Sequence, residues 1–272
     1  MSYYQVLGLE KEPFSTSPDP DFFYPSVSHN SALKRLEIAI RLRRGLNIVL
    51  GDVGTGKTTL GRMLLQLFKD EPEYIFHIIL DPSYKSEFQF LWSLCKMFGV
   101  TPLFRSTLDY KDALEKHLFQ KGVDENKTIV LIIDEGQKLT PTHLEILRTL
   151  LNYETNKFKL LQLVIFGQIE LLPRIRKIKN FMDRVNLKYI INPLDEAETK
   201  AMINFRLKQA GYIAENGAFF TEGAIRLIYQ HTQGYPRRIS LLCHDALEGV
   251  IMDGKNTVDD TVVEKIIAQE VR

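Results

Sequence analysis

One glycine-rich stretch carries the clearest chemistry in this 272-residue sequence. Residues 51–58 read GDVGTGKT and match the pattern G-x-x-x-x-G-K-[ST] at every fixed position. Glycines let backbone N–H groups surround phosphate oxygens where a Cβ would crowd them. The helix that starts near Lys57 directs the positive end of its dipole at the same anion. The stretch therefore predicts a loop that binds nucleotide phosphates.

The side chains of this loop have separate expected roles. Lys57 supplies a mobile positive charge for the β and γ phosphates, and Thr58 offers its hydroxyl to Mg²⁺. The residues expected to line the phosphates are Asp52, Val53, Gly54, Thr55, Gly56, Lys57, Thr58 and Thr59. A ligand-free glycine turn is the alternative, but the apolar run 46–50 before the loop and the helix-forming stretch after it favour phosphate binding.

An acidic pair completes the expected site. The apolar run 128–133, TIVLII, ends in Asp134 and Glu135. A magnesium site needs only one or two carboxylates beside substrate phosphates, so Asp134 is expected to hold Mg²⁺, usually through water. Glu135 is then the candidate base that activates an attacking water. The alternative is a solvated acidic turn at the end of a strand.

Two further polar side chains are candidates for sensing the γ-phosphate. Gln168 follows the apolar run 160–166, and in a parallel sheet it comes beside Glu135, where its amide would orient water. The second is an arginine of the sequence GYPRRI, Arg237 or Arg238, at the start of a helix in a domain that could fold over the site. The alternatives are a glutamine in a surface turn and a solvated arginine at a helix that begins with proline.

Arginines before the last strand are candidates for a group supplied to a neighbouring subunit. If subunits form a ring, Arg184 is the preferred arginine finger and Arg176 the second choice. The alternative for Arg184 is an intrachain ion pair or a solvated side chain.

The elements that must position these residues alternate between strand and helix. Strands are predicted at 46–50, 74–80, 128–133, 160–166 and 185–191, and continuous apolar runs such as 128–133 are typical of a parallel sheet covered on both faces. The strand 74–80 is expected to be buried, and His77 inside it is expected to be a core histidine. The predicted fold class is α/β, a parallel-sheet P-loop core followed by an all-α lid.

Helices are predicted at 31–44, before the first of these strands, and at 86–98, 107–121, 141–152 and 169–183 between the later ones. Asn30 or Ser31 would cap the first of them and Gly45 would end it. Its basic residues Lys34, Arg35, Arg41, Arg43 and Arg44 form either a solvated face or a patch for nucleic acid or an acidic partner. Inward positions are expected at Phe88, Leu91, Trp92, Cys95, Leu108, Ala113, Leu114 and Leu118.

The pattern changes after Pro193. Helices are predicted at 195–210, 221–232, 236–252 and 258–270, with no obvious strand. The predicted domains are an arm at 1–28, an α/β ATPase domain at 29–193 and a helical lid at 194–272. The arm is rich in proline and aromatic residues, so we expect it either to cover the nucleotide site or to pack only on its own domain.

Composition narrows the class of protein. With 44% hydrophobic and 25% charged residues, the sequence is that of an ordinary soluble globular protein. The balance of 35 basic and 34 acidic residues gives no global argument for nucleic acid or membrane binding. The two cysteines are expected to be reduced core residues. No signal peptide or spanning run is apparent, so the expected compartment is the cytoplasm.

The order of these motifs resembles that of AAA+ ATPases. More narrowly, GDVGTGKTT, IDEGQKL, FGQIELL and GYPRRI resemble motifs of the ExeA/GspA-type ATPases of the general secretion pathway. The N-terminal part of the resemblance comprises Leu7-Gly8-Leu9, Pro13-Phe14, Pro18-Asp19-Pro20, Phe23-Tyr24, His29 and Ala32-Leu33. It implies ATP and Mg²⁺ as ligands, Gln168 as sensor 1, Arg237 as sensor 2, Arg184 at the finger position, and residues 23–32 near adenine.

The resemblance implies an ATP-hydrolysing enzyme that drives or regulates assembly of a secretion or cell-envelope complex. The implied partners are further copies of the chain, in an ATP-dependent ring or filament, and a membrane protein in trans that would hold the chain at the inner membrane. Secretion ATPases of this type continue into a transmembrane segment and a peptidoglycan-binding domain, whereas these 272 residues end after the lid. The alternative is therefore a DNA-binding transposition regulator, similar to the TniB and MuB type, that uses ATP as an assembly switch, although the net charge of +1 does not favour DNA.

Overall fold

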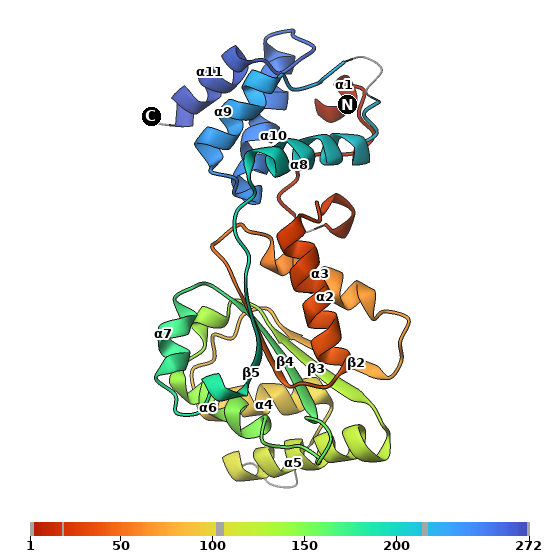
Figure 1. Cartoon of the computed structure of the whole chain (residues 1–272), viewed down its shortest axis with the longest axis vertical. Helices are drawn as coiled ribbons and strands as arrows, with labels where there is room; N and C mark the ends of the chain where they lie inside the picture. Colours follow the sequence, from red (N-terminus) through yellow and green to blue (C-terminus); the bar gives the residue numbers. More distant parts are fainter. Residues whose placement is uncertain (1–2, 18, 102–105, 214–216, 271–272) are drawn as a thin grey trace. The chain divides into compact units, whose positions relative to one another are not determined.

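The computed structural model describes residues 3–17, 19–101, 106–213 and 217–270 (Figure 1). Pro18, part of the N-terminal resemblance, lies outside the described residues. The chain divides into two compact units. The helical unit comprises Met1–Ser28, Val53–Thr59 and Asn192–Arg272, and the α/β unit comprises His29–Asp52 and Leu60–Ile191.

A five-stranded parallel sheet forms the centre of the α/β unit, which confirms the predicted fold class. Its strands are β1 (Leu46–Leu50), β2 (Tyr74–Ile79), β3 (Thr128–Ile133), β4 (Leu161–Gly167) and β5 (Val185–Ile190), in the order β2-β3-β4-β1-β5. The three inner strands are buried along their whole length. The prediction that 74–80 is a buried strand is wrong in detail, because β2 is an edge strand whose residues are mostly half-buried.

The two faces of the sheet are buried by different helices, as the strand period of two requires. Alternate residues such as Leu131 and Leu163 pack with α4 (Glu87–Phe98), α5 (Thr107–Phe119), α6 (Pro141–Leu150) and α7 (Leu171–Arg176). The opposite face includes Phe166, which is closely approached by Gly61 of α3 (Lys57–Leu67). Three short helical turns complete the unit: Gln120–Asp124, Gly136–Lys138 and Met182–Arg184.

The first long helix, α2 (Val27–Arg41), begins and ends earlier than predicted. Asn30 and Ser31 lie inside it, because the N–H of Val27 finds a side-chain acceptor in Glu198, 3.2 Å away, and the helix starts there. Arg43 has φ 51° and Gly45 φ 87°, so the chain already leaves the helix before the predicted end.

Two other helix predictions are corrected by the structure. The predicted helix 169–183 is the short α7, which ends at Arg176, followed by a separate turn at Met182–Arg184. Asn180 lies between them with φ 62°, which is not a helical conformation. Among the predicted inward residues, Leu91, Cys95, Leu114 and Leu118 are buried. Phe88, Trp92 and Leu108 are exposed instead, because hydrophobic periodicity alone assigned too wide a face to α4 and α5.

His77 and the two cysteines are not among the candidate site residues. His77 is half-buried and stacks on Phe98, and burial lowers its pKa to about 4. Cys95 and Cys243 are free and buried, as predicted.

The helical unit contains α1 (Tyr3–Val6), the turn Pro20–Phe22, α8 (Glu196–Gln209), α9 (Glu222–Thr232), α10 (Pro236–Met252) and α11 (Asp260–Glu270). Leu9, Phe14 and Phe22 of the N-terminal arm belong to its hydrophobic core. Arg206 of α8 donates to the carbonyl of Ser15 at 3.1 Å, which anchors the arm. The arm therefore packs within the helical unit, and its covering of a nucleotide stays a prediction.

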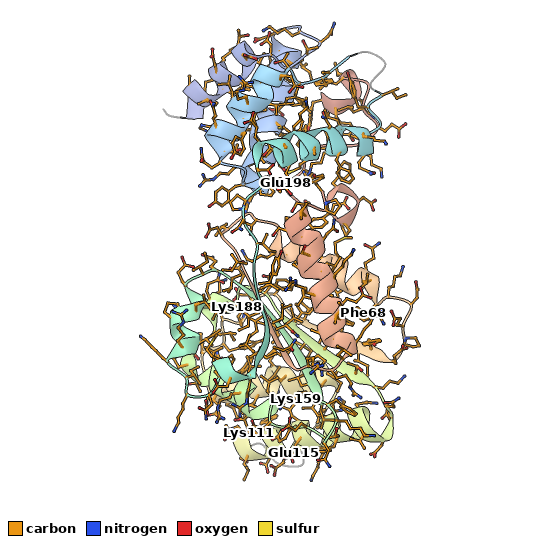
Figure 2. The ribbon with its side chains drawn as sticks, viewed as in Figure 1. Phe68, Lys111, Glu115, Lys159, Lys188 and Glu198 are labelled. Atoms are coloured by element: carbon orange, nitrogen blue, oxygen red, sulfur yellow. The ribbon has the colours of Figure 1, made fainter. Side chains whose placement is uncertain are left out.

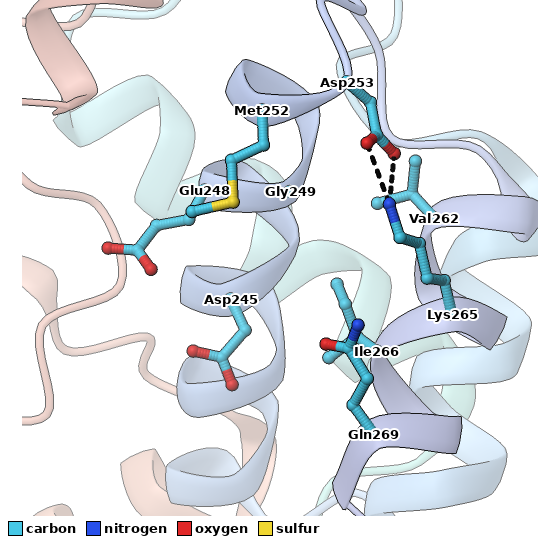
Figure 3. A pocket seen from close by; sticks show the side chains of 9 residues that line it. All are labelled: Asp245, Glu248, Gly249, Met252, Asp253, Val262, Lys265, Ile266 and Gln269. Atoms are coloured by element: carbon cyan, nitrogen blue, oxygen red, sulfur yellow. Dashed lines mark hydrogen bonds and ion pairs between the residues drawn. The ribbon is translucent and has the colours of Figure 1, made fainter.

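An open groove of about 410 Å³ lies between α10 and α11 (Figure 3). Met252, Val262 and Ile266 contribute its apolar lining, and an ion pair between Lys265 and Asp253, 2.8 Å long, lies at its border. None of the predicted site residues lines it. In the described part of the chain, no helix has both the length and the apolar character needed to cross a lipid bilayer.

Candidate nucleotide-binding site

The glycine loop lies where the sequence predicts it, between β1 and α3. Gly54 and Gly56 have φ values of 82° and 91°, a backbone conformation that residues with a Cβ rarely adopt. Lys57 is the first residue of α3 and only 8% exposed. The loop thus combines left-handed glycines, a helix N-terminus and a sequestered ammonium group, which together suit an anion.

The carboxyl ends of three neighbouring strands meet at one edge of the sheet. Leu50 of β1 is in register with Gly167 of β4, and Ile133 of β3 with Ile165 of β4. The N–H of Gly51 donates to the carbonyl of Gly167 at 3.1 Å, which fixes the first residue of the loop to the end of β4. The loop therefore begins at the same edge as the acidic pair.

The acidic pair follows β3. Asp134 is 6% exposed, and its Oδ1 accepts a 2.8 Å hydrogen bond from the N–H of Glu135. Glu135 is half-buried and has φ 52°, an uncommon conformation for a residue with a side chain. Such backbone strain is often found at functional sites, so it supports a special role for this residue.

Gln137 links the acidic pair to the end of β4. Its Nε2 donates to Glu135 Oε2 at 2.6 Å, and its Oε1 accepts from the N–H of Gln168 at 3.1 Å. The carbonyl of Gln137 in turn accepts a 2.5 Å hydrogen bond from Arg174 of α7. Gln168 and Glu135 are therefore connected through a third side chain.

Two glycines allow this close approach of β3 and β4. A Cβ on Gly136 would lie 2.4 Å from Ile165 Cγ2 and 3.0 Å from the carbonyl oxygen of Phe166. A Cβ on Gly167 would lie 3.0 Å from a methyl group of Leu171. Larger residues would separate the strand ends and lengthen the hydrogen bonds of Gln137.

Arg237 contacts the glycine loop inside the helical unit. It lies in the first turn of α10, and its N–H donates to the carbonyl of Gly54 at 3.3 Å. A Cβ on Gly54 would lie 2.9 Å from the Cβ of Arg237. The structure thus brings this arginine to the loop that is predicted to hold the phosphates.

The two candidate finger arginines differ in their surroundings. The guanidinium of Arg184 donates to Asn152 Oδ1 at 2.6 Å and to the carbonyl of Asn180 at 2.6 Å. Arg176 is exposed, and its side chain has no hydrogen bond or ion pair to any described residue. Arg184 is therefore engaged within its own chain, whereas Arg176 is available to another molecule.

The predicted site residues form two groups. Asp134, Glu135 and Gln168 lie together at the edge of the sheet, and Gly54 lies against Arg237 in the helical unit. Gln137, which links Glu135 to Gln168, is a further candidate that sequence reasoning missed. Its only signal in the sequence is its place two residues after the acidic pair.

These features define the class of protein to which the chain belongs. A parallel sheet with a G-x-x-x-x-G-K-[ST] loop after β1 and an acidic pair after β3 belongs to a P-loop nucleotide-binding protein. The sequence model of the AAA domain family matches residues 40–175, half of the chain, so this chain belongs to the AAA domain family.

One curated relative extends the similarity beyond that domain. The chain is 35% identical over 266 residues to General secretion pathway protein A of Aeromonas hydrophila. The match covers 94% of this chain and 46% of the relative, so the chain spans about half of the relative's length.

Solved structures share the fold at low sequence identity. The Aeropyrum pernix ORC2 protein superposes with a TM-score of 0.68 at 16% identity, covering 95% of this chain and 71% of that one. Drosophila ORC bound to DNA superposes with a TM-score of 0.68 at 19% identity, and the match covers 100% of this chain and 66% of that one. The Thermotoga maritima RuvB Holliday junction branch migration motor superposes with a TM-score of 0.60 at 13% identity, and the match covers 90% of this chain and 72% of that one. These likenesses confirm the fold of a P-loop protein with helices after the sheet.

Proposed function

We propose that this chain is a Mg²⁺-dependent ATPase. The observation that carries the proposal is the loop of left-handed glycines, Gly54 and Gly56, followed directly by Lys57, which is only 8% exposed. The buried Asp134 and the strained Glu135 after β3 support it. Backbone N–H groups of the loop would hold the phosphates, and Lys57 would neutralise the β and γ phosphates. Membership of the AAA domain family supports this assignment.

The side chains proposed to bind the metal suit magnesium. Mg²⁺ prefers hard oxygen ligands, and the residues offered are a carboxylate, Asp134, and the hydroxyl of Thr58. Bound Mg²⁺ would supply charge for the phosphate oxygens as the γ-phosphate leaves. Glu135 would accept the proton of the attacking water, and the amide of Gln168 would orient that water as sensor 1.

Arg237 is proposed as the residue that reads the γ-phosphate from the lid. Its hydrogen bond to Gly54 and its contact with the same residue support this role. A guanidinium binds phosphate oxygens through several fixed N–H groups, so the angle of the lid would depend on which nucleotide is bound.

The test of this function is steady-state phosphate release from ATP, measured against protein concentration with Mg²⁺ and with EDTA. We expect release that requires Mg²⁺ and a specific activity that rises with concentration as subunits assemble. Nucleotide binding without phosphate release under any of these conditions would contradict the proposal and leave an ATP-dependent scaffold.

A neighbouring subunit is proposed to complete the site with an arginine. Arg184 is the candidate from the sequence, but its hydrogen bonds to Asn152 and Asn180 favour Arg176 for contact in trans. A charge-assisted hydrogen bond is worth about 1.5–3 kcal/mol, so we expect Arg176→Ala to lower the ATPase rate roughly 10- to 100-fold. Mixing this variant with Lys57→Ala chains should restore activity, because each chain supplies what the other lacks.

The matched control is Arg184→Ala, which we expect to hydrolyse ATP at close to the wild-type rate at high protein concentration. A loss of activity in Arg184→Ala with restoration by mixing, and none in Arg176→Ala, would assign the finger to Arg184 instead. If neither variant recovers on mixing, the site is not shared between subunits.

The biological setting is proposed from the curated relative. A protein named General secretion pathway protein A supports a role in driving or regulating assembly of a secretion or cell-envelope complex. For this role we propose a membrane-protein partner in trans, which would hold the chain at the inner membrane from the cytoplasmic side.

A DNA-binding regulator is the second candidate function. It is favoured by one observation, the structural likeness to Drosophila ORC bound to DNA. The basic helix offers less positive surface than the sequence suggests. Arg41 is paired with Glu37 and Glu71 and lies over the ring of Phe68, which is labelled in Figure 2. Arg43 is half-buried and donates to the carbonyl of Lys127 at 2.6 Å.

We therefore expect duplex DNA to leave the ATPase rate unchanged and to bind only weakly. The measurement is fluorescence anisotropy of labelled duplex with ATP between about 50 and 200 mM salt, where a protein with six to ten phosphate contacts loses about 10³–10⁵ in affinity. Tight binding with such a salt dependence, together with a stimulated ATPase rate, would favour the DNA regulator over the secretion role.

A further inference from the structure

The carboxamide of Gln137 has both of its ends occupied. Its Nε2 lies 2.6 Å from Glu135 Oε2, and its Oε1 lies 3.1 Å from the backbone nitrogen of Gln168. The other carboxylate oxygen of Glu135 has no hydrogen bond to any described residue. One oxygen of the proposed base is thus held, and the other is left for a water molecule.

The orientation of this amide is determined by a main-chain donor. A backbone N–H can only donate, so the N–H of Gln168 requires the amide oxygen of Gln137 to face it. The NH₂ group must then face Glu135, where it donates to the carboxylate. A flip of the amide would lose both hydrogen bonds at once, so the two partners fix one orientation.

The backbone that carries Gln137 is also held. Its carbonyl accepts from Arg174 of α7 at 2.5 Å, and it follows Gly136, whose position leaves no room for a Cβ beside Ile165. The position of the amide is therefore determined by β4 and α7 together, and these elements do not carry the acidic pair.

We propose that Gln137 is a positioning residue that orients Glu135 for water activation. The inference rests on the proposed ATPase function and deepens it. The amide does not contact the reacting atoms. It holds one carboxylate oxygen so that the other presents its lone pair to water, and it connects this base to Gln168, the proposed sensor. A base held in one orientation by a second residue reaches the transition state with less reorganisation.

The test uses Gln137→Met, which keeps the length of the side chain and removes both hydrogen bonds. We expect kcat for ATP hydrolysis to fall about 10- to 100-fold with KM unchanged, because outer residues that orient a catalytic group typically contribute this much. Gln137→Glu keeps the acceptor but removes the donor, and we expect its kcat to fall at least as far. The matched control is Gln66→Met on the exposed side of α3, which should behave as wild type.

A double-mutant cycle distinguishes positioning from a structural role. If Gln137 acts through Glu135, then Gln137→Met combined with Glu135→Gln will be no slower than Glu135→Gln alone. Equilibrium binding of a fluorescent ATP analogue to each variant checks that the loop is intact, and we expect unchanged affinity.

Three results would overturn the inference. They are a wild-type kcat in Gln137→Met, a matching loss of nucleotide affinity in that variant, or additive effects in the cycle. Each of these leaves the ATPase function in place if the wild type hydrolyses ATP. A wild type that binds ATP and never hydrolyses it would overturn both proposals together.

Discussion

Lys57→Ala is expected to lower ATP hydrolysis by about 100- to 1,000-fold and to weaken ATP binding as well. Removing one preorganised positive group or N–H donor that stabilises the charge developing in the transition state typically lowers the rate by about this factor. Lys57 is the first residue of α3 and only 8% exposed, so water does not easily replace it. The measurements are calorimetric titration with ATP and steady-state phosphate release.

The control for this variant is Lys69→Ala, which removes an exposed lysine after the same helix. It should bind and hydrolyse ATP as wild type does. Equal ATP affinity and equal turnover in Lys57→Ala and wild type would mean that the loop does not hold the phosphates, despite its left-handed glycines.

Glu135→Gln should separate binding from hydrolysis. The amide is nearly the same size as the carboxylate but cannot accept a proton from water, and loss of a general base typically costs about 10²–10⁴ in rate. We therefore expect ATP affinity to be retained and hydrolysis to fall by this factor. Because ATP then persists, the variant should remain in an ATP-bound oligomer, which size-exclusion chromatography with light scattering will detect.

Glu264→Gln, at an exposed position of α11, is the matched control for the loss of one negative charge. It should leave both oligomer and turnover unchanged. If Glu135→Gln hydrolyses ATP at the wild-type rate, the base is another group and the proposed role of Gln137 fails with it.

Much of the fold could be predicted because the local hydrophobic patterns are the ones that a parallel sheet with both faces covered requires. The buried runs that form β1, β3 and β4 are continuous in the sequence, and a parallel sheet with both faces covered requires that pattern. The glycine loop and Asp134 could be predicted because their chemistry imposes residue types at fixed positions in the sequence. The helices after Pro193 also form where periodicity predicts them.

The errors arise where tertiary contacts override local pattern. Asn180, at φ 62°, separates α7 from the turn that follows in a stretch whose pattern predicts one helix. Glu198, far away in sequence, provides an acceptor at the start of α2. Gln137 could not be predicted as a candidate site residue, because its partners are the backbone N–H of Gln168, directly after β4, and a side chain two residues away. Such a link becomes visible only when the register of β3 and β4 is known.

The most direct test of the central claim is a single-turnover experiment. Excess wild-type protein is mixed with γ-labelled ATP, and conversion of the bound nucleotide to ADP and phosphate is followed with Mg²⁺ and with EDTA. We predict complete conversion with Mg²⁺ and none with EDTA. Bound ATP that stays intact in the presence of Mg²⁺, at protein concentrations where subunits associate, would contradict an ATPase and identify the chain as a protein that only binds the nucleotide.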